Sequence, residues 1–319
     1  MITIPIQVCG DVWDNRAQVQ EQLDKTHPGQ AVMLDLCSEG PSLHKLGITD
    51  LLSSYELDIS ITRWSNSVEQ VPYKKVFCNS QSHFYPMSLH YWIDEIPNLV
   101  PAEFKFALFI GRATAPRARI FYDVAHHWPG QFLLSKMSTR VNPNPWTMSV
   151  RETPGSWFAD IDQTWFASCG ISSIDNRSVQ DQYRIPEISA AEVAKSLMAH
   201  YHRFNIELVC ETYTLGDTFF ATEKTVRAIV GNRPFVVYGP KNYLYNLRSQ
   251  EGFKTFSDLW DESYDLLEGM DRWQAIQQLI HVLASMNESQ WHDLVVAAAE
   301  VTKHNRTVLK KIIDDRKKI

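Results

Sequence analysis

Cysteine is scarce in this 319-residue chain, which has five cysteines and no CxxC pair. An odd number of scattered cysteines does not fit the disulfide framework of a small secreted domain. Cys9, Cys78 and Cys210 each end or interrupt an apolar run, which is typical of reduced core cysteines in a cytosolic protein.

Long hydrophobic runs and basic leader segments are absent as well. No stretch approaches the 18 uninterrupted apolar residues of a membrane span, and the N-terminus lacks the basic region of a signal peptide. The net charge is −6 and the pI is about 6.0, so the chain as a whole offers no electrostatic case for nucleic acid, although a local basic patch is still compatible with it. We therefore expect a cytoplasmic protein with no membrane partner.

Several catalytic signatures are missing too. The chain contains no GxGxxG, no GxxxxGK[ST] and no GxSxG, and it shows no internal repeat. The adjacent pair His126 and His127 lacks metal-ligand spacing with thiols or carboxylates, and so do the dispersed His281, His292 and His304. Asp160 and Asp162 form a DxD pair, but no strand clearly leads into them. We expect neither a metal nor a cofactor.

What the chain does contain is a regular alternation of apolar runs and amphipathic runs. In residues 1–102 the pattern predicts strands at 2–10, 31–37, 57–64 and 74–79 and helices at 15–27 and 42–55. Such alternation is typical of βαβ units on a parallel sheet. A Pro- and aromatic-rich connection follows, and we place a domain boundary near residues 99–103.

A second alternating series occupies residues 103–268. It predicts strands at 104–111, 131–137, 205–213 and 234–239, with helices at 117–128, 190–204, 222–231 and 241–250. Residues 269–319 predict two more helices, roughly 270–286 and 288–316, which we expect to pack back on the first domain or on the cleft. The fold class is therefore α/β, with two Rossmann-like domains facing across a cleft, the default place for a ligand.

The stretch ETYTLGDTFFATEKT, residues 211–225, stands out in the second domain. A strand ends at Glu211 and a helix begins near Thr222, so that unpaired backbone N–H groups offer a seat for phosphate. Lys224 lies in the first turn, where the helix dipole disfavours a cation unless an anion is bound. Glu223 and Lys224 are equally compatible with an ordinary solvated helix surface.

Two further segments help to decide between a phosphate site and an ordinary solvated helix surface. GRATAPRAR, residues 111–119, places Arg112, Arg117 and Arg119 after the first strand of the same domain, and arginine suits bidentate phosphate contacts. Residues 252–265 carry Asp258, Asp261, Glu262 and Asp265 among aromatics. These acids either cap local structure or hold the cations in place.

The run FFATEKTVRAIVGNRPFVVYGP, residues 219–240, resembles the nucleotide-sugar motif of α-1,3-fucosyltransferases and related GT-B-fold glycosyltransferases. The resemblance implies that Glu223 contacts the ribose and Lys224 the diphosphate of a UDP- or GDP-linked sugar, with Glu211 and Thr222 at the same site. It also implies a phosphate clamp at Arg117. Because GRATA replaces the family's asparagine-rich lead, Arg112 and Arg119 are alternatives for that clamp.

A transferase of this kind also needs a base for the acceptor hydroxyl, which we expect in the first domain. The favoured candidates are Asp11 and Glu69, and Asp35, His83 and Glu95 remain open. Trp146, Trp157 and Trp165 are compatible with an acceptor platform or with loop packing.

The combination of TEKT, GFKTF and DESYD also resembles proteins of tailed-phage genomes, which would place the chain in a host cytoplasm. This makes a hydroxymethylated pyrimidine in phage DNA the leading acceptor, with a glycan as the alternative. The seven Lys and Arg residues of the final 17-residue segment are the only sequence support for a DNA partner. A non-catalytic nucleotide-binding protein is the competing class, and the sequence does not indicate an oligomeric state.

Overall fold

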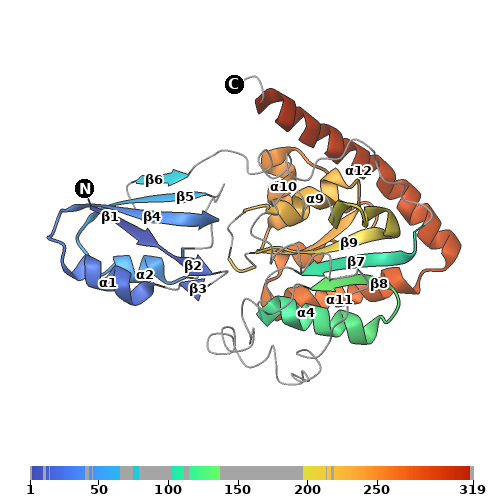
Figure 1. Ribbon diagram of the computed structural model, residues 1–319, viewed down its shortest axis with the longest axis horizontal. Helices are drawn as coiled ribbons and strands as arrows, with labels where there is room; N and C mark the ends of the chain where they lie inside the picture. The colour runs from blue at the N-terminus through green and yellow to red at the C-terminus, as the bar shows by residue number, and fades with distance from the viewer. Residues whose placement is uncertain are drawn as a thin grey trace.

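The protein has a mixed α/β fold with two parallel sheets, each covered by helices (Figure 1). The computed structural model describes residues 2–9, 12–13, 15–39, 43–44, 46–64, 75–78, 102–110, 115–136, 197–212, 214–216 and 219–316. The buried apolar residues form two separate clusters, one around each sheet. The predicted α/β class and the parallel strands are therefore confirmed.

The first sheet has the strand order β1-β4-β5-β6 with every neighbouring pair parallel. Its elements are β1 (Ile2–Ile6), α1 (Arg16–Asp24), β4 (Ala31–Glu39), α2 (Ile48–Leu52), β5 (Asp58–Trp64) and β6 (Lys75–Cys78). Both helices lie below this sheet in Figure 1 and bury their apolar side chains against it. From Thr3 to Ile6, exposed and buried residues alternate along β1, as expected for a strand that is covered on one face.

Two predictions in this part of the chain need correction. The strand expected at 2–10 ends at Ile6, because the backbone N–H of Gln7 donates to the Asn15 side chain at 2.8 Å instead of extending the pairing with β4. Strands β2 (Val8–Cys9) and β3 (Val12–Trp13) then form a small antiparallel ribbon. A helix was expected over 42–55, but the observed helix α2 is limited to Ile48–Leu52. It begins after Gly47, whose backbone has a left-handed conformation.

The second sheet has the order β10-β9-β7-β8, again with every neighbouring pair parallel. Its elements are β7 (Phe104–Ile110), α4 (Ala115–His127), β8 (Phe132–Lys136), β9 (Phe204–Cys210), α9 (Glu223–Val230), β10 (Phe235–Tyr238) and α10 (Tyr243–Glu251). The chain runs outward from β7 to β8, then returns to β9 on the other side of β7 and continues to β10. The strand order therefore reverses between β7 and β9, which makes this point the topological switch of the sheet.

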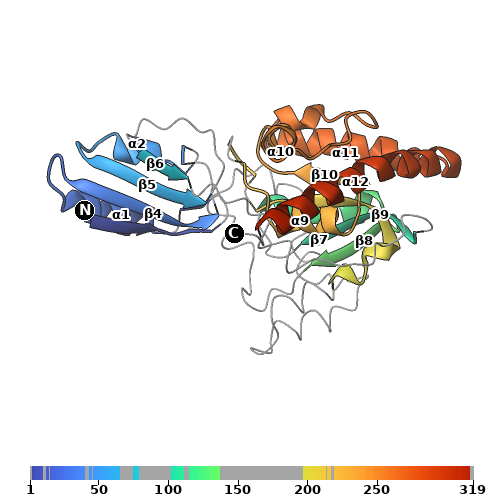
Figure 2. The same ribbon diagram turned by 90° about the horizontal axis from the view of Figure 1, so that it is seen from above.

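Helices cover both faces of the second sheet. Helices α4 and α11 (Gly269–Ser285) lie below it in Figure 1, where the Trp273 indole donates to Asp123 of α4 at 2.7 Å. Helices α9 and α12 (Glu288–Arg316) lie above it, and Figure 2 shows α12 crossing over the strands. The Arg306 guanidinium on α12 donates to the carbonyl of Val230 at the end of α9. The two predicted C-terminal helices are therefore present, and these contacts join them to the second sheet.

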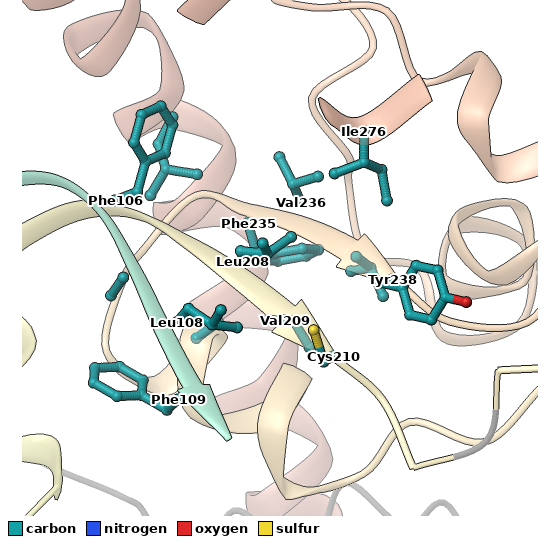
Figure 3. Packing of buried hydrophobic residues seen from close by; sticks show 14 of the residues in the cluster. Phe106, Leu108, Phe109, Leu208, Val209, Cys210, Phe235, Val236, Tyr238 and Ile276 are labelled. Atoms are coloured by element: carbon teal, nitrogen blue, oxygen red, sulfur yellow. The ribbon is translucent and has the colours of Figure 1, made fainter. Parts of the chain in front are cut away.

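Burial on both faces explains the continuous apolar runs of this half. All seven residues of β9 are buried, and the side chains in Figure 3, among them Phe106, Leu208 and Val236, pack between the sheet and its helices. Cys210 at the end of β9 is buried and free, as predicted for a reduced core cysteine.

One helix of the second series was predicted too long. The pattern over 190–204 predicted a helix to its end, but Tyr201–Arg203 is a short 3-10 helix and Phe204 already belongs to β9. The pairing of Phe204 with Phe104 on β7 overrides the local helical pattern. Within the residues the structure describes, no helix is both long and apolar enough to span a bilayer.

Candidate anion-binding site at the switch point

The candidate site lies where β7 and β9 end side by side at the switch point of the second sheet. Ligands of open α/β sheets bind beyond the carboxyl ends of the strands at this place. Glu211 and Thr212 follow β9 directly, α9 begins at Glu223, and α4 follows β7. The segments that the sequence singled out are therefore brought to one edge of one sheet.

Glu211 lies at the centre of this edge and is fully buried. Its carboxylate accepts hydrogen bonds from the Thr222 backbone N–H at 3.2 Å and from the Thr222, Thr225 and Tyr243 hydroxyls at 2.5, 2.6 and 2.8 Å. Burial raises the pKa of Tyr243, and the Glu211 charge raises it further, so this hydroxyl keeps its proton and donates. Glu211 thus fixes the start of α9 relative to β9 and α10.

Lys224 is held on the inner side of the helix start with only 8% of its side chain exposed. Its ammonium lies 3.0 Å from the Thr212 hydroxyl, 3.1 Å from the Thr222 hydroxyl and 2.6 Å from a Glu223 carboxylate oxygen. The Thr222 hydroxyl also accepts from the Lys224 backbone N–H at 3.3 Å, as an N-cap does. Lys224 is therefore not a solvated surface lysine.

Glu223 supplies the negative charge that a lysine in the first helical turn requires. Burial by itself raises the pKa of Glu223, but the charge and hydrogen bond of Lys224, with the charge of Arg227, outweigh it and lower the pKa to about 2. The Glu223 side chain is 29% exposed, compared with 8% for the side chain of Lys224. The neighbouring Glu223 carboxylate therefore balances the positive charge of Lys224.

The arginines of 111–119 separate into different roles. Arg117 is 3% exposed, and its guanidinium donates to the Cys210 carbonyl at the end of β9 at 3.1 Å. Arg119 turns instead to Asp123 at 2.8 Å, on the part of α4 that contacts α11. Of these two alternatives for the clamp, the structure places Arg117 at the switch point.

Arg117 and Lys224 converge on one atom. The Thr212 hydroxyl oxygen lies 3.0 Å from the Lys224 ammonium and 3.5 Å from an Arg117 guanidinium nitrogen. Two buried cations at a single hydroxyl, beside the start of a helix, form an arrangement suited to an anion with several oxygens.

A second charged layer beneath the site was not predicted from the sequence. The Arg227 guanidinium on α9 donates twice to Glu207 on β9, at 2.9 and 2.7 Å, and lies 3.5 Å from the Phe109 carbonyl of β7. Glu207 also accepts from the Tyr201 hydroxyl at 2.6 Å. The sequence contained one indication of this ion pair, the glutamate Glu207 in the apolar run NIELVC, because an acid inside a buried strand needs a partner.

Three of the acids of residues 252–265, Asp261, Glu262 and Asp265, have structural partners. Asp265 accepts from the Leu244 and Tyr245 backbone N–H groups at 3.0 Å each, so it caps α10, and it pairs with the buried Arg272 at 3.1 Å. Glu262 accepts from the Thr255 hydroxyl at 2.6 Å. Glu262 and Asp265 therefore accept hydrogen bonds from local structure, and they pair with Arg248 and Arg272 instead of the arginines of 111–119.

Several candidates fall outside the residues that the structure describes. These are Asp11, Glu69, His83, Glu95, Arg112, Trp146, Trp157, Asp160, Asp162 and Trp165. Asp35 lies on β4, opposite Pro5 and Thr62. In the described part of the chain, no group of three or more His, Cys, Asp or Glu side chains is arranged to hold a metal ion.

The chain matches no protein-family model, and a search of curated proteins finds no match. The chemistry of the site must therefore carry the functional argument.

Proposed function

We propose that the protein is a nucleotide-sugar-dependent glycosyltransferase that binds the diphosphate of its donor at the switch point of the second sheet. The observation that carries this proposal is the convergence of Arg117 and Lys224 on the Thr212 hydroxyl beside the start of α9. A diphosphate presents several charged oxygens to such a cluster, and hydrogen bonds between charged groups are the strong ones.

The ion pair between Glu223 and Lys224 suggests how the donor enters. A phosphate oxygen takes the place of the Glu223 carboxylate at Lys224, and the partly exposed carboxylate then accepts from a ribose hydroxyl. This exchange agrees with the two roles that the fucosyltransferase-like motif implies for these residues.

In the proposed reaction an acceptor hydroxyl attacks the anomeric carbon while a base takes its proton. A new C–O bond forms, the bond between the anomeric carbon and the diphosphate oxygen breaks, and the nucleoside diphosphate leaves. Arg117 and Lys224 stabilise the negative charge that develops on the leaving group. In the GT-B arrangement that we propose, the first sheet supplies the base, with Asp11 and Glu69 as the favoured candidates.

A hydroxymethylated pyrimidine in DNA is the acceptor that we favour, with a glycan as the alternative. Exposed Lys310 and Lys311 lie near the end of α12, and Lys317 and Lys318 follow beyond the described residues. Basic side chains of this kind contact phosphates without reading sequence, so they would position the duplex while the site selects the base.

The deciding experiment is a thermal-shift panel of UDP, GDP, CMP and their common sugar conjugates, with and without divalent metal. We expect one nucleoside diphosphate family to raise the melting temperature of the wild type. We expect Lys224→Ala to weaken that ligand roughly tenfold to a hundredfold, because a hydrogen bond to a charged group contributes about 1.5–3 kcal/mol. Donor hydrolysis should fall with binding, and Lys25→Ala, which removes an exposed lysine of α1, serves as the matched control.

The outcomes separate the competing classes. A folded Lys224→Ala variant with unchanged affinity and turnover contradicts the proposed donor site. Stabilisation of the wild type without hydrolysis or transfer favours a non-catalytic nucleotide-binding protein. No stabilisation by any compound contradicts the proposal as a whole.

A further inference from the structure

Thr212 has a hydroxyl proton that the two neighbouring cations leave unused. Ammonium and guanidinium groups only donate hydrogen bonds, so the Thr212 oxygen is the acceptor toward both Lys224 and Arg117. A threonine hydroxyl has two lone pairs and one proton. Among the described residues, no acceptor receives this proton.

Exposure places Thr212 on the outer side of the cluster. Arg117 and Lys224 are 3% and 6% exposed, whereas Thr212 is only partly buried. Thr212 is therefore the most accessible of the three residues.

The cations also change what this hydroxyl can do. A group that accepts hydrogen bonds from charged donors is polarised and becomes a stronger donor itself. The 3.0 Å contact with Lys224 lies within the usual range for a hydrogen bond, and the 3.5 Å contact with Arg117 adds charge at short distance. A phosphate oxygen is the natural acceptor for such a donor.

On the strength of the donor site proposed above, we infer that Thr212 is the third binding group of that site. It donates its hydroxyl proton to a phosphate oxygen of the bound diphosphate and holds Arg117 and Lys224 directed at the same ligand. The hydroxyl is therefore a determinant of diphosphate affinity.

The test measures the binding of inorganic pyrophosphate to the full chain by titration calorimetry. Thr212→Val keeps the shape of the side chain and removes the hydroxyl, and we expect it to weaken pyrophosphate about tenfold, the effect of losing one hydrogen bond to a charged group. Thr212→Ser keeps the hydroxyl, and its affinity should stay within roughly twofold of the wild type. Thr302→Val is the matched control, because Thr302 is a buried threonine of α12 whose hydroxyl donates to the Ala299 carbonyl.

Thermal unfolding without ligand shows whether each variant folds. Unchanged pyrophosphate affinity in a folded Thr212→Val variant overturns the inference and leaves the proposed function standing. A Thr212→Ser variant as weak as Thr212→Val also overturns it, because shape and not the hydroxyl would then matter. A wild type that binds neither pyrophosphate nor any nucleotide refutes the proposed function and this inference together.

Discussion

At the scale of single residues, the ion pair of Glu223 and Lys224 makes stability depend on pH. The pKa of Glu223 falls from 4.5 to about 2 on folding, so the folded state binds this proton less readily than the unfolded chain. The stabilisation is therefore present above pH 4.5 and is lost as the pH falls toward 2. We expect the wild type to lose more stability than Glu223→Gln over this window, as measured by urea unfolding at a series of pH values.

A control variant separates this effect from general acid denaturation. Glu288 is an exposed acid in the first turn of α12, and Glu288→Gln removes one acid at a helix start away from the candidate site. If Glu223→Gln and the wild type lose stability in parallel between pH 4.5 and 2, the pair does not stabilise the fold.

At the scale of elements, the pair of Arg227 and Glu207 fastens α9 to β9. Both side chains are buried, and their closest contact is 2.7 Å. Arg227→Met leaves the Glu207 carboxylate in a buried place without its cation, so we expect a loss of about 3–5 kcal/mol in the free energy of unfolding. Adding Glu207→Gln removes the uncompensated charge and should recover part of that loss in urea unfolding.

The exposed pair of Lys310 and Asp314 gives the control for this comparison. It joins neighbouring turns of α12 at 2.5 Å with both side chains about half exposed, so Lys310→Met should cost less than about 1 kcal/mol. A double variant no more stable than Arg227→Met alone would mean that the buried charge is not the source of the loss.

The elements themselves were largely predictable from sequence, and the failures have local causes. Strands such as Phe104–Ile110 and Phe204–Cys210 are mostly apolar because both faces of the second sheet are covered, which makes their runs easy to recognise. The ribbon of β2 and β3 was missed because two-residue strands carry almost no pattern.

The site was predictable only in its outline. The sequence indicated the helix start at Thr222 and the arginines after β7, because both lie next to strand ends that parallel topology brings together. It did not separate Arg117 from Arg119, since two residues along α4 decide which side each faces. Nor did it reveal Thr212 or Arg227, whose roles depend on contacts between distant segments.

At the scale of the whole molecule, the net negative charge disfavours a nucleic-acid partner, and the basic C-terminal segment is the exception. The chain carries a net charge of −6, so contact with duplex DNA has to come from a local surface. Under the proposed function, Lys310 and Lys311 of α12 are the candidates for that surface, and Figure 2 shows α12 passing over α9, whose start forms part of the proposed donor site. The proposed DNA-binding surface and the proposed donor site would then both lie in the part of the protein built around the second sheet.

This arrangement predicts that the binding of duplex DNA containing hydroxymethylated pyrimidines weakens with salt through the end of α12. Changing Lys310, Lys311, Lys317 and Lys318 to Gln should flatten the dependence of log K on log salt by about 0.9 for each phosphate that the variant no longer neutralises. Lys311→Gln alone should flatten it more than Lys25→Gln, which removes an exposed lysine of α1 that pairs with Glu21. Fluorescence anisotropy over a salt series measures both slopes. Salt-independent binding, or equal slopes for the quadruple variant and the wild type, would exclude this surface and favour the glycan acceptor.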